Sequence, residues 1–395
     1  MRPRSICDYG GCLLIGLMLV SSEVAAAEAV ARKNEQMGAI SSVAQTPTIP
    51  DQEVGEYIRA RQKFDEESGQ YWKLVVEKRR IRLAKRRNNE SVQIDDYVLT
   101  QPPAYTGPPK PAILMQVPDR APPAHVPIIT DFLKSAAAYF NFVPQRPQHE
   151  IDYKREYARV ASSVGLTKEQ VVRIYAFESG GNGTYDVQAG LEYPTSRAQA
   201  INTALGYNQL LNTNSVELMA EYGDQFIGTL QLKAGRLTGE AWKILEDKIK
   251  VLRRVIQFCR TVPDKWTEHD KLANTAQGLG VHAMLLDLDV GPLLQAQKLV
   301  NSVMFARNRG YSAVLTAAEL EMMNLTGDGN GFEIVTMSPT MRNRVPTSNF
   351  FQQSGYERNS VAIRNNIVAK LIAATDAKLD REDKLQGARD LAASF

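Results

Sequence analysis

Apolar positions recur at helical spacing through the second half of the chain. A repeat of three to four residues predicts helices, and these cover residues 152–163, 168–178, 213–223, 239–259, 291–308, 315–325 and 359–393. No group of segments alternates apolar and polar positions as the strands of a half-buried sheet do. We therefore predict a mostly α domain over residues 149–395.

Residues 51–97 form a second helical region, and its charge is uneven. The stretch Lys73–Arg87 holds eight basic residues and one acidic residue, with apolar side chains interleaved. A solvated helix face is one interpretation, and contact with an anionic surface such as membrane headgroups or wall polymers is the other. The net charge of the whole chain is only +3, so binding to nucleic acid is not expected.

Proline separates these two helical regions. Eleven of the nineteen prolines lie between residues 102 and 147. Proline fixes φ and lacks a backbone donor, so residues 98–148 are predicted to be a semi-rigid linker with one short helix near residues 128–142. Because domain boundaries fall in such linkers, we expect a fragment from about residue 148 to fold alone.

The N-terminus has the features of a secretory signal. Two arginines precede the apolar run Cys12–Val20, which is too short to span a bilayer, and three alanines that follow offer a cleavage site. Removal of a signal peptide over residues 1–27 predicts export to the periplasm or cell envelope, and an uncleaved anchor is the alternative. The mature chain would begin near Glu28 with a flexible tether over residues 28–50.

One carboxyl group is placed where chemistry is expected. Thr167 and Gln170 have the spacing of a capping box at the start of a helix, and Glu178 ends that helix before a glycine-rich segment. The helix C-terminus is electronegative and the neighbouring aromatic residues desolvate the carboxyl, so both effects raise its pKa. A carboxyl that keeps its proton near neutral pH can protonate a glycosidic oxygen. A solvent-exposed glutamate at a frayed helix end is the alternative.

A second motif follows thirty-one positions later, at Gln209. Glu178-Ser179, followed by Gly206-Tyr207-Asn208-Gln209 and a polar helix start, resembles the soluble lytic transglycosylase family, of which this chain would be a divergent member. The resemblance implies a lysozyme-like helical domain with extra C-terminal helices. It implies that Glu178 is both acid and base and that Ser179 orients it. The substrate-binding residues that it implies in the cleft are Gly206, Tyr207, Asn208 and Gln209.

A third segment stands where that family carries an Ala-Tyr-Asn motif. The nearest equivalent here is Thr347–Phe351, followed by Tyr356. By the same resemblance, Asn349 and Tyr356 would contact an N-acetyl sugar. A packed loop is the alternative.

The reaction of that family needs one carboxyl group and no cofactor. The acid protonates the leaving oxygen between N-acetylmuramic acid and N-acetylglucosamine, then accepts the proton of the muramyl 6-hydroxyl, and a 1,6-anhydro end results. Peptidoglycan is thus the implied substrate. Two other functions remain open: a muramidase-type hydrolase, with Asp186 or Glu192 as second carboxylate, and a non-catalytic wall-binding or scaffold protein.

Other chemistries lack their motifs. The four histidines have no metal-ligand spacing and no Cys-x-x-Cys pair occurs, so no metal is expected. Asp328–Gly331 lacks the ligand positions of a calcium loop and predicts a turn. Cys259 lies among apolar helix positions, which predicts a buried and unreactive thiol.

Overall fold

The computed structural model describes residues 49–115, 125–191 and 198–395. This part of the chain is mostly helical, as the apolar pattern predicts, and its β-type pairings are isolated bridges. The predicted signal peptide, nearly all of the predicted tether, and Glu192 lie outside the described residues. Among the described residues, no helix is both long enough and apolar enough to cross a membrane.

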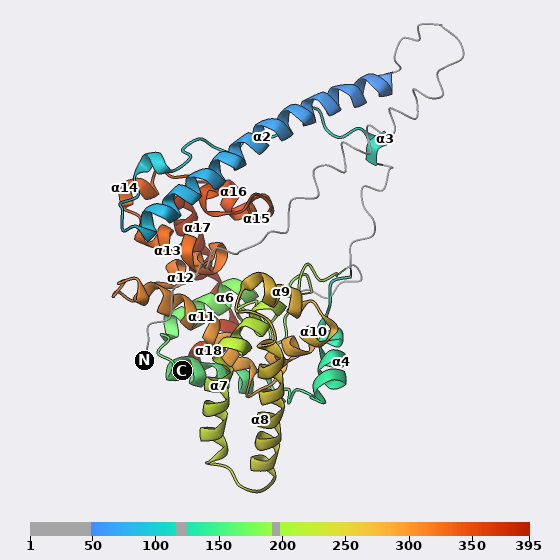
Figure 1. Ribbon diagram of the computed structural model, residues 1–395, viewed down its shortest axis with the longest axis vertical. Helices are drawn as coiled ribbons and strands as arrows, with labels where there is room; N and C mark the ends of the chain where they lie inside the picture. Colours follow the sequence, from blue (N-terminus) through green and yellow to red (C-terminus); the bar gives the residue numbers. More distant parts are fainter. Residues whose placement is uncertain (1–48, 116–124, 192–197) are drawn as a thin grey trace, which may run out of the picture. The chain divides into compact units, whose positions relative to one another are not determined.

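The chain divides into two units, and the boundary in the C-terminal region falls within α17 (Val368–Glu382). The described part of unit 1 comprises His125–Thr336 and Ile372–Phe395, and that of unit 2 comprises residues 49–115 and Met337–Leu371. The other helices of unit 1 (Figure 1) are α4 (Ile129–Phe140), α5 (Glu150–Ser163), α6 (Lys168–Ser179), α7 (Asn212–Ala234), α8 (Gly239–Cys259), α9 (Trp266–Ala273), α10 (Ala276–His282), η2 (Ala283–Leu286), α11 (Gly291–Asn308), α12 (Ala317–Thr326), α13 (Asp328–Thr336) and α18 (Gln386–Ala393).

Helix α10 lies inside unit 1, where it packs against α4, α7 and α9. Gly280 permits the approach to α4, because a Cβ at that position would lie 2.9 Å from the backbone nitrogen of Ala136. Buried apolar side chains of α4, α5, α6, α7, α8 and α11 form one continuous core, to which the fully buried Cys259 belongs as predicted. Burial of this surface is the main term that stabilises the unit.

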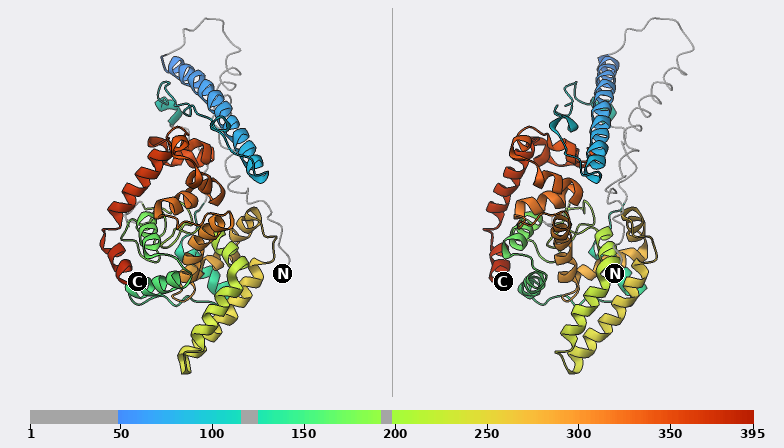
Figure 2. Two further views of the ribbon diagram at one scale, coloured as in Figure 1. Left: turned by 90° about the vertical axis from the view of Figure 1, so that its left-hand side faces the viewer. Right: turned by 60° about the vertical axis from the view of Figure 1, so that its left-hand side comes forward.

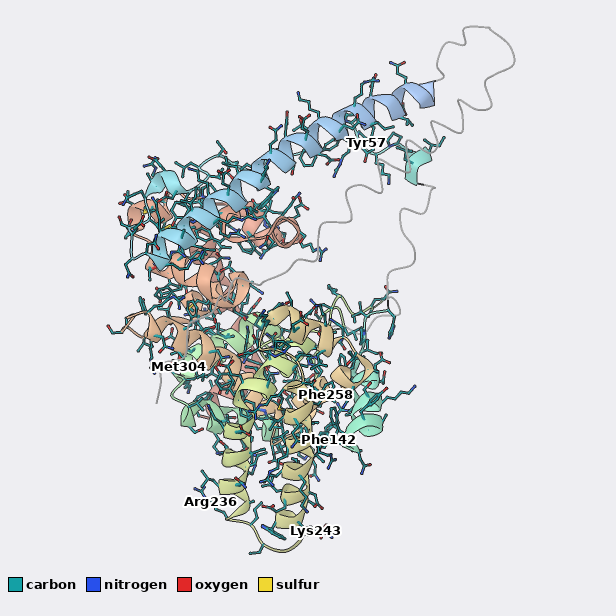
Figure 3. All side chains as sticks on the ribbon, viewed as in Figure 1. Tyr57, Phe142, Arg236, Lys243, Phe258 and Met304 are labelled. Atoms are coloured by element: carbon teal, nitrogen blue, oxygen red, sulfur yellow. The ribbon has the colours of Figure 1, made fainter. Side chains whose placement is uncertain are left out.

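Helices α7 and α8 lie side by side as a hairpin, which both views in Figure 2 show. Gly223 allows the contact, because a Cβ there would lie 2.3 Å from Cγ1 of Ile256. Figure 3 labels Arg236 in the connection between the two helices and Lys243 near the start of α8. The sequence prediction ended the first helix at residue 223, whereas packing against α8 continues it to Ala234.

Unit 2 is held together by two buried arginines of its long helix. Arg79 donates to the carbonyl oxygen of Phe351 at 2.7 Å, and both Arg79 and Arg82 donate to that of Asn349. These bonds hold the turn that contains Asn349 against the helix. The elements of unit 2 besides the start of α17 are α2 (Ile49–Arg87), η1 (Ile94–Asp96), α3 (Ala112–Met115), α14 (Pro339–Arg342), η3 (Thr347–Phe350), α15 (Gln353–Arg358) and α16 (Ser360–Arg364).

The division into units differs from the boundary predicted at residue 149. Residues 337–371 belong with α2 and not with the helices that precede them. The Asn349 amide both accepts from the backbone nitrogen of Val98 and donates to its carbonyl oxygen, and hydrogen bonds of this kind leave no mark on apolar periodicity. A fragment from residue 148 would carry residues 337–371 without these partners.

Three smaller predictions also need correction. The region 359–393 is not one helix but three, because Asn365 and the residues after Glu382 interrupt it. Asp328–Gly331, which was predicted to be a turn, begins the helix α13, and Gly331 lets that helix pack closely against α12. In the basic stretch of α2, the side chains of Arg79 and Arg82 are buried within the unit and do not form a solvated face.

Candidate active site

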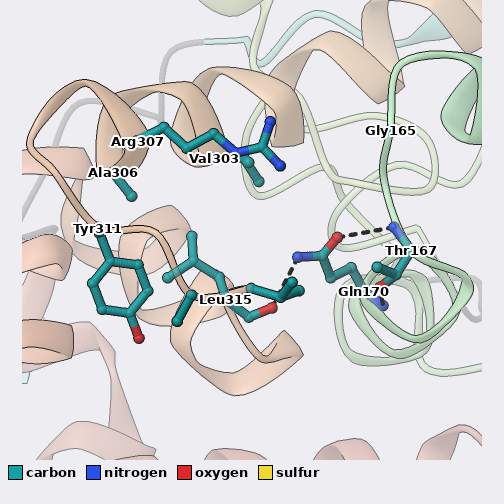
Figure 4. A pocket seen from close by; sticks show the side chains of 10 residues that line it. Gly165, Thr167, Gln170, Val303, Ala306, Arg307, Tyr311 and Leu315 are labelled. Atoms are coloured by element: carbon teal, nitrogen blue, oxygen red, sulfur yellow. Dashed lines mark hydrogen bonds between the residues drawn. The ribbon is translucent and has the colours of Figure 1, made fainter.

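Helix α6 begins and ends as its sequence predicts. The Thr167 hydroxyl accepts from the backbone nitrogen of Gln170 at 3.2 Å, and the Gln170 side chain accepts from that of Thr167 at 3.0 Å. This capping box is confirmed, and the Gln170 amide also donates to the carbonyl oxygen of Leu315 (Figure 4). At the other end, Gly180 has a φ of +65°, which ends the helix just after Glu178.

The residue Glu178 is partly buried at this helix end, and the amide of Asn324 on α12 donates to the Oε1 atom of its carboxyl at 2.5 Å. Burial raises the pKa of Glu178 above its ordinary value, which is the predicted direction. The hydrogen bonds and the positive charges of Lys378 and Lys298 oppose that effect without cancelling it. Lys378 is held nearby, because its ammonium donates to the carbonyl oxygen of Phe177 at 3.1 Å. Glu178 is therefore a carboxyl that retains its proton more strongly than an exposed glutamate does.

A second carboxyl, which the sequence interpretation missed, lies beside Glu178. Glu321 on α12 is fully buried, and among the described residues no N–H or O–H group donates to either of its oxygens within hydrogen-bonding geometry. The pKa of Glu321 lies well above its ordinary value. Burial is the larger cause, and the negative charge of Glu178, within hydrogen-bonding reach, is the next. The signal in the sequence is an acid inside the apolar run Leu320–Met323.

Ser179 does not have the role that the resemblance implied. Its hydroxyl donates to the carbonyl oxygen of Tyr175 at 2.6 Å, as a serine in a helix can do with the carbonyl four residues earlier. Asn324, from a helix that lies far along the sequence, makes the hydrogen bond to Glu178 instead.

The Gly206–Gln209 segment is held in the core beside α6. Gly206 has a φ of +80°, and a Cβ there would lie 2.1 Å from Nε2 of Gln295. The ring of Tyr207 is fully buried and makes an edge contact with that of Tyr175 at 4.7 Å between centroids. Since Tyr175 stands one helical turn before Glu178, this contact supports the end of α6 that carries the acid.

The predicted groove-lining roles therefore need correction. The Tyr207 hydroxyl donates to the Glu150 carboxylate, and the buried Asn208 amide donates to the hydroxyl of Tyr157 at 2.7 Å, so neither side chain faces solvent. Gln209 is partly exposed, but its amide donates to the carbonyl oxygens of Val187 and Gly206. Within this segment, only Gln209 has a side chain that a ligand can reach.

Asn349 and Tyr356 belong to unit 2 and are both buried there. The Asn349 side chain accepts a hydrogen bond from the backbone nitrogen of Val98 and donates one to its carbonyl oxygen. The Tyr356 ring packs on that of Trp72 at 5.5 Å between centroids. Their role is to fill and hydrogen-bond the unit, which is the packed-loop alternative. The predicted sugar contact is wrong for these two residues.

Two further acids bear on the question of a second carboxylate. Asp186 is engaged by Arg146 and accepts from the hydroxyl of Thr184 at 2.7 Å. Glu217 on α7 was not singled out from the sequence, yet burial raises its pKa to about 7, with Lys298 opposing the rise. The charge of Lys298 acts on both Glu178 and Glu217 and lowers the pKa of each.

A small hollow opens near the start of α6, at the opposite end of that helix from Glu178 (Figure 4). Its volume is about 40 Å³, and Gln170, Arg307 and Tyr311 are among the residues that line it. Pockets for small-molecule ligands are typically larger than about 300 Å³, so this hollow has room for water and not for a sugar ring. No cluster of histidine, cysteine and acidic side chains suited to a metal ion occurs within the described ranges.

A buried Ser–His pair is structural. Nε2 of His282 lies 2.8 Å from the carbonyl oxygen of Thr203 and must donate to it, so Nδ1 accepts from the hydroxyl of Ser215. Burial lowers the pKa of His282 to about 4, which keeps the ring neutral. Both side chains are fully buried, so no substrate reaches the serine hydroxyl.

Comparison of this chain with known protein families, with characterised proteins and with solved structures finds no match. A function is therefore inferred from the chemistry of the residues themselves. Among the described residues, the group best suited to chemistry is the Glu178 carboxyl with Glu321, Asn324 and Lys378 around it.

Proposed function

We propose that this protein cleaves the glycan strands of peptidoglycan as a lytic transglycosylase, on a lysozyme-like helical domain. The bond broken joins N-acetylmuramic acid to N-acetylglucosamine, and the product carries a 1,6-anhydro end. Glu178 is the acid and then the base. The observation that supports this most is the raised pKa of the Glu178 carboxyl at the end of α6, on a residue that is only partly buried.

The reaction requires that one group gives a proton and takes one back. A carboxyl held neutral by burial can protonate the leaving oxygen, and the carboxylate that remains can accept the proton of the muramyl 6-hydroxyl. Asn324 supports the first step, because an amide N–H that already points at Oε1 stabilises the carboxylate that forms when Glu178 gives up its proton. The Tyr207–Tyr175 contact keeps the helix end in place while the charge changes.

A hydrolytic reaction is a second candidate, because Glu217 is another carboxyl with a raised pKa near Lys298. Hydrolysis in two-carboxylate glycosidases uses a second acid as base or nucleophile across the sugar. The masses of the products separate the two reactions, because hydrolysis adds one water to the released fragment and transglycosylation adds none.

A peptidoglycan substrate also requires that the protein leaves the cytoplasm. The basic start, short apolar run and alanine triplet before Glu28 support export to the periplasm or cell envelope. A contact with an anionic surface through the exposed cations of Lys73–Arg87 remains part of this proposal. Lys73, Arg80 and Arg87 are the exposed cations of that stretch.

The decisive experiment compares wild type with Glu178→Gln on purified peptidoglycan. Glutamine keeps the size and polarity of the side chain but neither donates a carboxylic proton nor accepts one. We expect release of 1,6-anhydro fragments to fall by at least about 10²-fold, the low end for general acid–base catalysis. Mass analysis of the soluble products measures it, and binding to insoluble wall should persist.

Glu169→Gln provides the control, since Glu169 lies on the same helix but at its exposed first turn. This variant should release fragments at the wild-type rate. Equal release by wild type and Glu178→Gln would remove Glu178 from the mechanism. No release by either protein, with wall binding retained, would identify a non-catalytic binding or scaffold protein.

A further inference from the structure

Glu321 is a buried acid for which the reaction proposed above has no use. It lies on α12, which packs against α6, and Asn324 stands three residues later on the same face of α12. Its side chain is fully buried, and the polar groups beside it are the Glu178 carboxyl and the Asn324 amide. Two carboxyl groups in such contact do not both ionise without a large cost. One proton therefore remains between them.

We propose that Glu321 stays protonated and donates a hydrogen bond to Glu178, so that it holds the carboxylate that forms when Glu178 gives up its proton. This inference rests on the proposed function of Glu178. Ionised Glu321 would be a fully buried charge beside the Glu178 carboxyl, and the Asn324 amide and Lys378 favour the ionised form too little to offset that burial. Neutral Glu321 has one O–H to give, and Glu178 is the acceptor beside it.

The protons balance through the cycle. Glu178 transfers its proton to the glycosidic oxygen as the bond from that oxygen to the muramyl C1 breaks. The muramyl 6-oxygen then bonds to C1, and its proton returns to Glu178. The proton of Glu321 is not transferred in either step, so Glu321 is a positioning residue and acts through Glu178.

The charged groups around the pair favour this arrangement. Lys378 of α17 acts on both carboxyls, and Lys298 of α11 acts on Glu178. These positive charges stabilise a single negative charge, and the hydrogen bonds from Glu321 and Asn324 direct it to Glu178. A neutral acid that donates to a reacting oxygen is an established way for an apolar site to stabilise charge.

The test separates the O–H donor from the rest of the side chain. Glu321→Gln keeps a donor, as an amide N–H, whereas Glu321→Leu removes it at similar volume. We expect Glu321→Leu to lower kcat for 1,6-anhydro product release by about 10²-fold, as loss of one preorganised donor does, and Glu321→Gln to restore most of that loss. KM should change little in both, because Glu321 does not touch substrate. Equal kcat in all three proteins, or an equal fall in both variants, would overturn the inference.

A second measurement does not depend on catalysis. In the folded protein Glu321 keeps its proton at pH values above its ordinary pKa of 4.5, whereas in the unfolded chain it does not. As pH rises from 4.5, the folding equilibrium constant of wild type should therefore fall by up to tenfold per pH unit relative to that of Glu321→Gln. Glu319→Gln at the start of the same helix is the control and should show no such slope, since glutamine preserves its capping box.

Parallel pH profiles of wild type and Glu321→Gln would overturn the protonated state of Glu321 even if the enzyme is active. Conversely, wild-type protein that releases no product but shows the expected slope would refute the proposed function of Glu178 and leave the shared proton standing. The two proposals therefore fail separately.

Discussion

Two clusters of buried carboxyl groups lie in unit 1, and hydrogen-bond donors are distributed very unequally between them. Three backbone N–H groups and the Lys248 ammonium, at 2.9 Å, all donate to the fully buried Asp287 carboxylate. Next to it, Asp289 is bound by both Lys248 and Lys233. Glu321 is equally buried, yet within the described chain neither of its oxygens has a donor of this kind.

The difference separates a structural site from a chemical one. Burial raises the pKa of Asp287, but Lys248 and the backbone donors oppose that rise, and these bonds fix the chain around the carboxyl. A buried carboxyl without them stays neutral and shifts the pKa of its neighbour, which is the condition that proton transfer needs. Exposure alone does not distinguish the two clusters, whereas the number of donors does.

Among the variants that test this contrast, Lys248→Met should have the largest effect on stability. The substitution leaves Asp287 and Asp289 buried without their shared cation, so we expect a loss of about 3–5 kcal/mol in the free energy of unfolding. Urea unfolding at pH 7 measures it. Lys250→Met on the same helix should leave stability unchanged, because Lys250 is an exposed residue. A loss of less than about 1 kcal/mol in Lys248→Met would mean that the cluster is not structural.

Asp289→Asn tests the sign of the pH dependence. Burial alone would raise the pKa of Asp289, but Lys248 and Lys233 together hold it below its ordinary 3.8. Stability from this carboxylate is therefore present above pH 3.8 and is lost as pH falls through the lower folded pKa. We expect Asp289→Asn to lower the free energy of unfolding by about 2 kcal/mol at pH 7 and by much less near pH 2, as measured by urea unfolding. An equal cost at both pH values would contradict the ion pair.

Glu217→Gln should show the opposite sign. Burial raises the pKa of Glu217 to about 7, so its stabilising contribution is present below the ordinary 4.5 and is lost as pH rises through 7. Between pH 4 and pH 8, the free energy of unfolding of the variant should rise by about 1–2 kcal/mol relative to that of wild type. This is less than the full pKa shift implies, because the side chain is partly exposed. Thermal unfolding across that range measures it, and a difference that does not vary with pH would refute the raised pKa.

Glu178→Gln should have the smallest effect on stability, although its effect on activity should be large. The folded pKa of Glu178 lies above 4.5, so wild type loses stability as pH rises through the folded value and the glutamine variant does not. We expect the variant to be equal to wild type at pH 4 and more stable by about 1 kcal/mol at pH 8. A variant less stable than wild type at pH 8 would place Glu178 with Asp287, as a structural carboxylate.

Sequence patterns predicted unit 1 well and unit 2 poorly. Helices α8 and α11 begin and end where the apolar repeat places them, because one face of each packs on a continuous core. In unit 2, by contrast, the buried side chains of Arg79 and Arg82 fall within a basic stretch that also suits a solvated helix face. Their partners are backbone carbonyls on the turn near Asn349, and no local pattern marks a carbonyl as an acceptor.

The candidate site divides in the same way. The capping box at Thr167, the glycine that ends α6 and the position of Glu178 depend on residues a few positions apart, so the sequence alone was sufficient to predict them. The hydrogen bond from Asn324 joins residues 146 positions apart, and Glu321 lies on the same distant helix. Periodicity reports which face of a helix is buried but not which buried groups meet. Tertiary packing therefore decided that Glu178 has an acid for a neighbour and that Tyr207 supports its helix from within the core.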